Sequence, residues 1–251
     1  SLDDPQRYAR SLVVGKLLEQ GRGLAQQGDV AGAVAKFAEA LAFDPKLGIE
    51  PEAEAKRIYA PKVVEQGRVL AKQGDIIGAT VKFQEALALD PKLGIEPEAE
   101  AKRIYASEVV EQGRVLAEQG AISDAVAKFE EALALDPSLD TDPEVAEAWN
   151  ALCWFGATWN QAALVLDACE TAVKLAPDDG NIRGSRGLAR ALTGDVQGAI
   201  EDFEFALKRA KAEGLGEEFI QSRTQWVKAL REGQNPAVIF DAATLEGLRG
   251  E

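Results

Sequence analysis

The sequence of 251 residues contains no histidine and no methionine, and it has only two cysteines. Without histidine, Ser-His-Asp and Cys-His catalysis are excluded, as are the usual zinc sites that rely on an imidazole ligand. No apolar run approaches the roughly 18–20 residues that cross a bilayer, and no secretory hydrophobic segment is evident. We therefore expect no enzyme activity, no cofactor or metal, no membrane span and a cytoplasmic location.

Positive charge is also scarce. Lysine and arginine number 28 against 42 aspartates and glutamates, which gives a net charge of −14. Nucleic-acid surfaces need clustered basic residues, so a nucleic-acid partner is not expected. Aromatic residues make up only 6% of the chain, while alanine, leucine, glutamate, glutamine and lysine are abundant. This composition is typical of long amphipathic helices.

The most informative feature present is an internal repeat of 46 residues. Residues 16–61 and 62–107 are identical at 35 of 46 positions. Gln-Gly-Arg recurs at 20–22, 66–68 and 112–114, and Asp-Pro recurs at 44–45, 90–91 and 136–137. A fixed period of this length indicates a solenoid, in which each repeat buries its apolar face against its neighbours.

Each repeat predicts a long helix. In one copy it begins at Pro97, a residue suited to the first helical position, and it ends near Gln119 before a left-handed Gly120. In the preceding copy Pro61 lies inside the helix, where it cannot donate to the turn before it, so we expect a kink or split there. Residues 3–5, Asp-Asp-Pro, give the first helix the same kind of start.

A shorter helix follows in each repeat. In the second copy Asp75 is expected to cap it, and Phe83 is expected to fill the gap left opposite Gly67 on the long helix. Asp90 and Pro91 then end it.

Five small or apolar residues keep fixed places in these copies, the eighth, twentieth, twenty-fourth, twenty-seventh and thirty-second of each repeat. They are Gly21, Ala33, Phe37, Ala40 and Pro45; Gly67, Ala79, Phe83, Ala86 and Pro91; and Gly113, Ala125, Phe129, Ala132 and Pro137. This pattern resembles the tetratricopeptide repeat. A further copy contains Gly187, Ala199, Phe203 and Ala206, whereas the fourth has Cys153 and Cys169 in place of the glycine and phenylalanine.

The resemblance implies an all-α fold, a right-handed α-solenoid of five helix-turn-helix repeats in which the first three have extended first helices. We expect one domain spanning 1–251, with repeats at 5–45, 51–91, 97–137, 143–177 and 180–211. Residues 212–251 are expected to form a C-terminal cap and tail, with helices near 217–231 and 242–248. The last two repeats also resemble repeat blocks of large bacterial multidomain proteins.

Members of the family bind peptides or partner helices in a concave groove lined by first helices. The ninth place of each of the first three repeats is an arginine, namely Arg22, Arg68 and Arg114, which suits an acidic peptide. The alternative is that each arginine pairs with a glutamate three residues earlier. Trp154 occupies the same place in the fourth repeat and is a candidate contact residue, whereas core packing is expected for Trp149, Phe155 and Trp159. The residues of a carboxylate clamp are absent.

The two cysteines and a group of three arginines are further candidates for a special role. Cys153 and Cys169 should lie on facing helices as two buried reduced thiols rather than a disulfide. Arg183, Arg186 and Arg190 form a basic stripe, which either binds an anion or pairs with nearby acids, among them Asp178, Asp179, Glu201 and Asp202.

These observations favour a protein–protein adaptor or scaffold. Two alternatives remain open: a self-assembling structural protein built from near-identical repeats, and a regulatory module of a larger bacterial signalling protein. A homo-oligomer therefore stays among the expected partners. The identity of a protein partner does not follow from the sequence.

Overall fold

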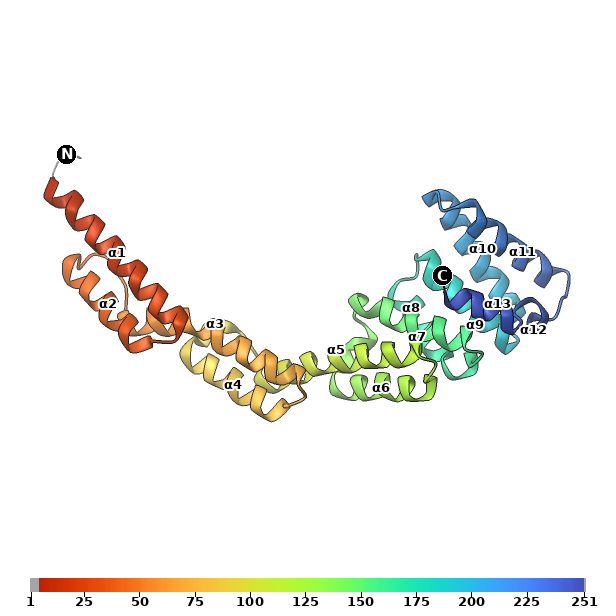
Figure 1. Ribbon diagram of the computed structural model, residues 1–251, viewed down its shortest axis with the longest axis horizontal. Coiled ribbons are helices and arrows are strands. Elements are labelled where there is room, and N and C mark those ends of the chain that lie inside the picture. The colour runs from red at the N-terminus through yellow and green to blue at the C-terminus, as the bar shows by residue number, and fades with distance from the viewer. Residues whose placement is uncertain (1–4, 251) are drawn as a thin grey trace. The chain divides into compact units, whose positions relative to one another are not determined.

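The fold of residues 5–250, with the side chains from residue 8 onward, is given by a computed structural model in which every regular element is a helix. The chain divides after Tyr105 into two compact units, Ser1–Tyr105 and Ala106–Glu251. We call them unit 1 and unit 2. The division falls within helix α5 (Pro97–Glu118). The fold is therefore all-α, as expected from the sequence (Figure 1).

Unit 1 consists of alternating long and short helices, each pair forming an antiparallel hairpin (Figure 1). Its elements are α1 (Pro5–Gln27), α2 (Val30–Phe43), α3 (Pro51–Lys72), α4 (Ile76–Leu89), the 3₁₀ turn Pro91–Leu93 and the first half of α5. The predicted cap residues at 3 and 4 lie outside the described part of the chain.

Close contact between a glycine and a phenylalanine holds each hairpin of unit 1 together. A β-carbon added at Gly67 would lie 2.6 Å from Cε1 of Phe83, and one added at Gly21 would lie 2.6 Å from Cε1 of Phe37. Both rings are buried. The predicted packing of Phe83 against Gly67 is confirmed, because only a residue without a side chain leaves room for the ring.

Local caps set the starts of the short helices. The carboxylate of Asp75 accepts a hydrogen bond from the Gly78 backbone N–H at 2.8 Å, and Asp29 accepts one from Gly32 at the same distance. The cap predicted at Asp75 is therefore confirmed.

Helix α3 continues through Pro61 as one helix, so the split does not occur, while the alternative of a kink stays a prediction. Proline removes one backbone hydrogen bond and crowds the preceding turn. However, the flanking Ala60 and Val63 are both fully buried in the core of unit 1. Tertiary packing on both sides of Pro61 thus holds together a helix that local propensity would break.

Unit 2 begins with the second half of α5 and ends with a group of short helices. Its further α-helices are α6 (Ile122–Leu135), α7 (Ala146–Thr158), α8 (Leu166–Leu175), α9 (Gly180–Thr193), α10 (Val196–Glu213), α11 (Glu217–Arg231), α12 (Pro236–Ile239) and α13 (Ala242–Arg249). The 3₁₀ turns are Pro137–Asp140, Pro143–Val145 and Ala162–Leu164. Gly120 has a φ of 83°, as predicted for the residue that ends α5. The helices predicted near 217–231 and 242–248 are present.

Aromatic rings attach the C-terminal helices to the last repeat. The ring centroid of Phe203 on α10 lies 5.5 Å from that of Trp226 on α11 and 6.2 Å from that of Phe240, which follows α12. Trp226 and Phe240 are themselves in edge-to-face contact at 5.1 Å. Such pairs stabilise by roughly 0.5–1.5 kcal/mol beyond their burial, so α11 covers the apolar side of α10.

Cys153 and Cys169 form a disulfide between α7 and α8, which corrects the expectation of two free thiols. Their Cα atoms are 4.9 Å apart, within the range that a disulfide bridges. The two cysteines occupy the places of the glycine and phenylalanine of the other repeats, where the helices approach most closely. The expectation relied on the assumed compartment, whereas the helix contact brings the two sulfur atoms together.

Candidate functional site

The repeated arginines of unit 1 lie on the exposed side of its long helices. Arg68 on α3 is 52% exposed and its Nη1 lies 3.6 Å from Oε2 of Glu65, which is 66% exposed. Ion pairs as exposed as this one contribute about 0–1 kcal/mol. Arg22 on α1 is exposed, and among the side chains described from residue 8 onward it has no ion-pair partner. Both guanidinium groups are therefore available to a ligand.

Arg114, in unit 2, has a different environment. Its Nε donates to Glu111 at 2.8 Å and its Nη2 donates to the same carboxylate at 2.7 Å, while Nη1 donates to Glu118. The hydrogen bond from Arg114 lowers the pKa of Glu111, and the two carboxylates raise the pKa of Arg114. Arg114 is thus firmly paired with glutamates of its own helix, as the alternative from the sequence proposed, whereas the pair of Arg68 with Glu65 is long and exposed.

The residue four places after each arginine explains this difference. It is Gln26 in the first repeat, Lys72 in the second and Glu118 in the third. Residues four apart are neighbours on a helix surface. Glu118 therefore supplies Arg114 with a second carboxylate, whereas Lys72 offers Arg68 none. This signal was present in the sequence.

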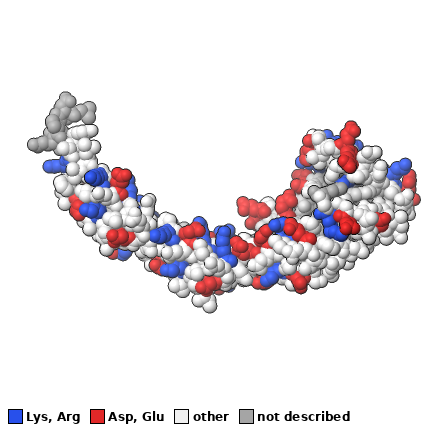
Figure 2. Space-filling model, viewed as in Figure 1, with Lys and Arg blue, Asp and Glu red and all other residues white. Residues whose placement is uncertain are grey.

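A second set of basic residues recurs with the same 46-residue spacing on the short helices. Lys36, Lys82 and Lys128 each bind the glutamate three residues later, with Nζ to carboxylate distances of 2.9, 2.6 and 2.6 Å. Basic and acidic side chains are interspersed along unit 1 on the face that Figure 2 shows. The paired lysines provide a reference set with the same charge as the arginines.

The tryptophans of α7 and the turn after it differ in their exposure. Trp149 is buried as expected: it packs against Phe129 with ring centroids 4.7 Å apart. Trp154 and Phe155 are half-buried. Trp159, for which core packing was expected, is instead 37% exposed. Trp159 lies directly after α7, where its ring contacts Gly120 and Arg249 and is not enclosed in the hydrophobic core.

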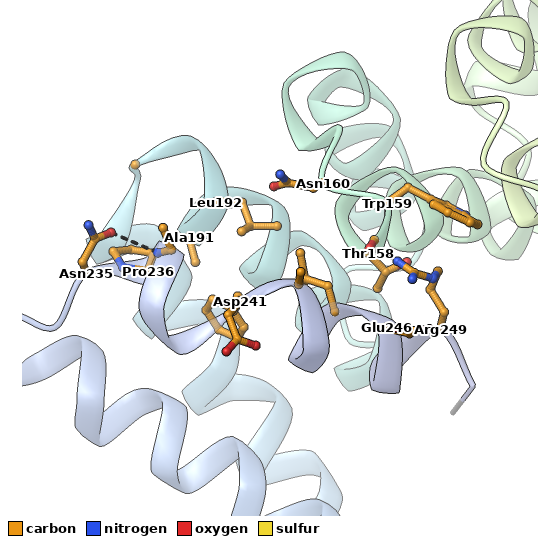
Figure 3. Close-up of a pocket in the computed structure, with 15 residues that line it drawn as sticks. Thr158, Trp159, Asn160, Ala191, Leu192, Asn235, Pro236, Asp241, Glu246 and Arg249 are labelled. Atoms are coloured by element: carbon orange, nitrogen blue, oxygen red, sulfur yellow. Dashed lines mark hydrogen bonds between the residues drawn. The ribbon is translucent and has the colours of Figure 1, made fainter.

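The C-terminal helices border an open cleft in unit 2. The cleft has a volume of about 600 Å³ and lies between the last residues of α7 and α9 and the segment 235–249. Figure 3 shows α13 with Arg249 directed towards Thr158 and Trp159, and Asn235 and Pro236 beside Ala191. No sequence pattern predicted this arrangement, because it joins residues up to 91 positions apart.

The arginine stripe of α9 forms a partly buried ion network, in which Arg186 and Asp202 are buried and Glu170 is exposed. Arg186 donates to both oxygens of Asp202, at 2.7 and 2.8 Å, and to Glu170 at 2.7 Å. Arg190 donates to the same two carboxylates. Burial alone would lower the pKa of Arg186, but Asp202 and Glu170 raise it above its ordinary value. Arg183 lies over the ring of Phe205 at 4.2 Å.

Only one of the four acids suggested by the sequence, Asp202, is central to this network. Asp179 caps α9 instead, and Glu201 accepts a hydrogen bond from Gln197. Glu170, on α8 of the preceding repeat, was missed because its approach depends on how the repeats stack. The network joins two repeats and leaves little room for an external anion.

In residues 5–250 no group of three or more acidic, cysteine or histidine residues could hold a metal ion. The same part of the chain contains no helix that is both long and apolar enough to cross a membrane.

Comparison with known proteins gives the class of this chain. Residues 110–154 match the family model described as tetratricopeptide repeat. No curated protein sequence matches the chain. The resemblance recognised from the sequence is thus confirmed, with residues 110–154 as the segment that the family model matches.

Three solved structures that match the chain have low sequence identity to it. The tetratricopeptide domain of P58(IPK) is 17% identical, with a TM-score of 0.42, and the match covers 86% of this chain and 56% of that one. PilF of Pseudomonas aeruginosa is 17% identical, with a TM-score of 0.31 and coverage of 94% and 99%. The TPR2AB domain of yeast Sti1, in complex with pHSP90, is 13% identical, with a TM-score of 0.32 and coverage of 96% and 100%.

Repeat proteins of this type commonly mediate protein–protein interactions through extended surfaces of stacked helices.

Proposed function

We propose that this chain is a protein-interaction module and that the exposed side of α1 and α3 binds an acidic segment of a partner protein. The observation that carries the proposal is the state of Arg68. Its ion pair with Glu65 is long, at 3.6 Å, and both side chains of the pair are exposed. Arg22 repeats the same position on α1. Guanidinium groups bind carboxylates through two parallel hydrogen bonds, which a partner rich in Asp and Glu would supply.

The other two candidate residues belong to unit 2. Arg114 would bind an acidic partner segment only after its hydrogen bonds to Glu111 and Glu118 break. Trp154, half-buried on α7, would offer an apolar contact, since aromatic residues are frequent anchors in interfaces. A catalytic role for the chain is not part of the proposal.

The test uses a fluorescent acidic peptide and its amide counterpart, in which Asn and Gln replace Asp and Glu. Binding is followed by anisotropy for the native chain, for R22E/R68E and for K36E/K82E. The two variants change the net charge equally, but the lysines lie on the short helices. We expect R22E/R68E to weaken binding at least tenfold, since hydrogen bonds to charged groups contribute about 1.5–3 kcal/mol each.

The control variant K36E/K82E should bind nearly as well as the native chain, and the amide peptide should bind weakly. Equal losses in both variants would indicate general charge attraction and would contradict a specific surface on α1 and α3.

Self-association is a second candidate function, favoured by one observation on α1. Leu12 and Val13 are 57% and 42% exposed. Their counterparts 46 residues later, Ile58 and Tyr59, pack against the preceding repeat. A second copy covering this face would give a particle heavier than one chain in light scattering, and L12E/V13E would return it to a monomer. A native monomer at micromolar concentration would contradict this function.

A further inference from the structure

The segment that contains α12 and α13 returns across the ends of α7 and α9. It is amphipathic: Phe240, Leu245 and Leu248 are buried, whereas Ala242, Ala243 and Glu246 are exposed. Leu245 lines the cleft together with Thr158 and Leu192, whereas Phe240 packs against Phe203 and Trp226. Helix α13 is thus seated on unit 2 by two buried leucines, Leu245 and Leu248.

A polar latch fixes the end of α13. Arg249 Nη1 donates a hydrogen bond of 2.6 Å to the carbonyl oxygen of Thr158, the last residue of α7. The last carbonyls of a helix lack partners within it, and the negative end of the helix dipole favours a cation. The same guanidinium lies 4.1 Å from the centre of the Trp159 ring. Arg249 therefore recognises both the end of α7 and the aromatic residue after it.

Trp159 connects this latch to the turn after α5. Its Nε1 donates to the carbonyl of Glu118 at 3.3 Å, and a β-carbon on Gly120 would come within 2.7 Å of the indole ring. The contacts with Glu118 and Gly120 hold the indole from the side of α5 without any part of α13.

The segment fills its site incompletely. An open cleft of about 600 Å³ remains beside it, lined in part by Asn160, Leu192 and Asn235. A helix with larger side chains would bury more apolar surface here than α13 does.

Capping the last repeat does not require α13. Helix α11 covers α10 through Trp226, and the aromatic cluster with Phe203 is completed at Phe240, before α13 begins. Helix α13 therefore contributes contacts to α7 and Trp159 that lie outside the cap.

We propose that the ends of α7 and α9 form a docking site for a short amphipathic helix of a partner protein, and that α13 (residues 242–249) occupies this site in cis. The partner helix would carry two leucines three residues apart followed by an arginine, as in α13, with a bulkier apolar residue directed into the cleft. This is recognition of a helix in a groove. The tethered segment competes at high effective concentration, so the native chain binds such a partner weakly until the segment is released. The proposal is independent of Arg22 and Arg68.

The experiment uses a fluorescent peptide with the sequence of residues 235–250 as the probe. It is titrated with the native chain, with the released variant L245E/L248E and with the control A242E/A243E. Both variants add two negative charges to α13, but only the first removes buried anchors. We expect the released variant to bind the peptide at least tenfold more tightly than the native chain and the control, which should behave alike. The milder variant R249A should fall between them.

Three outcomes would overturn the proposal. A released variant that keeps its helical circular dichroism but does not bind the peptide would show that the site accepts no helix in trans. Loss of the helical signal of unit 2 in that variant would show that α13 is a core element. A native chain that forms dimers by exchanging α13, detected by light scattering, would make a second copy the occupant.

Discussion

The contact between Gly67 and Phe83 shows how one pair of residues sets the distance between two helices. The ring occupies the space that any side chain at position 67 would need. The sequence predicts this pair because both residues recur with a fixed spacing in each of the first three repeats. The physical reason lies in shape: a bare backbone opposite a flat ring lets two helices approach closely.

Replacing Phe83 by alanine should lower the free energy of unfolding by about 3–5 kcal/mol, because the ring is completely buried and leaves a cavity. Urea denaturation of F83A beside the native chain measures the change. The exposed Val81 on the same helix gives the control, since V81A should change stability by less than about 0.5 kcal/mol. Equal effects of the two substitutions would contradict this account.

Arg114 provides a second prediction at the residue scale. Neutralising its two partners in E111Q/E118Q should free the guanidinium and give unit 2 a measurable affinity for the acidic peptide. Anisotropy measured in the R22E/R68E background isolates this gain. The control variant E111D/E118D keeps both negative charges beside Arg114, so its binding should stay low. If the glutamine variant binds no better than its parent, the intrahelical ion pairs are not what keeps Arg114 from a ligand.

The disulfide between α7 and α8 is the main departure from the repeat pattern at the scale of elements. It replaces the glycine–phenylalanine contact by a covalent bond between residues 16 positions apart. A loop of this size contributes roughly 3 kcal/mol through restriction of the unfolded chain. Reductant should therefore lower the midpoint of thermal unfolding of the native chain. C153A/C169A should unfold at the lower temperature with or without reductant; a native chain insensitive to reductant would refute this.

The sequence predicts an element or contact when the residues that determine it lie close together along the chain. Proline at a helix start, Asp75 as a cap and Gly120 as a stop act within a few residues, and all three were predicted correctly. Glu170 with Arg186, and Arg249 with Thr158, join residues of different helices, and no local pattern marks such pairs. At Pro61 the local pattern favours a kink or a split, and the split does not occur because the residues on both sides are held in the core.

At the scale of the whole molecule, stability should be local because each repeat contacts only its neighbours. R186A would leave Asp202 buried without its main partner, at a cost of about 3–5 kcal/mol. Hydrogen exchange should then accelerate in α8, α9 and α10, while α1 to α4 keep their protection. R57A, which removes an exposed pair with Glu54, should change neither region. Loss of protection in α1 to α4 would indicate global coupling instead.

The turns of unit 1 have a consequence for how such a gene changes in length. Gly28 receives the ring of Tyr59, and Gly74, 46 residues later, receives the ring of Tyr105 in the same manner. The turns of the first two repeats therefore accept the long helix that follows them in the same way. An in-frame deletion of residues 62–107 leaves Gly28 with Tyr59 and joins Pro61 to the remainder of the next long helix. Recombination between the near-identical segments would thus lengthen or shorten the protein in steps of 46 residues, each product retaining matched junctions.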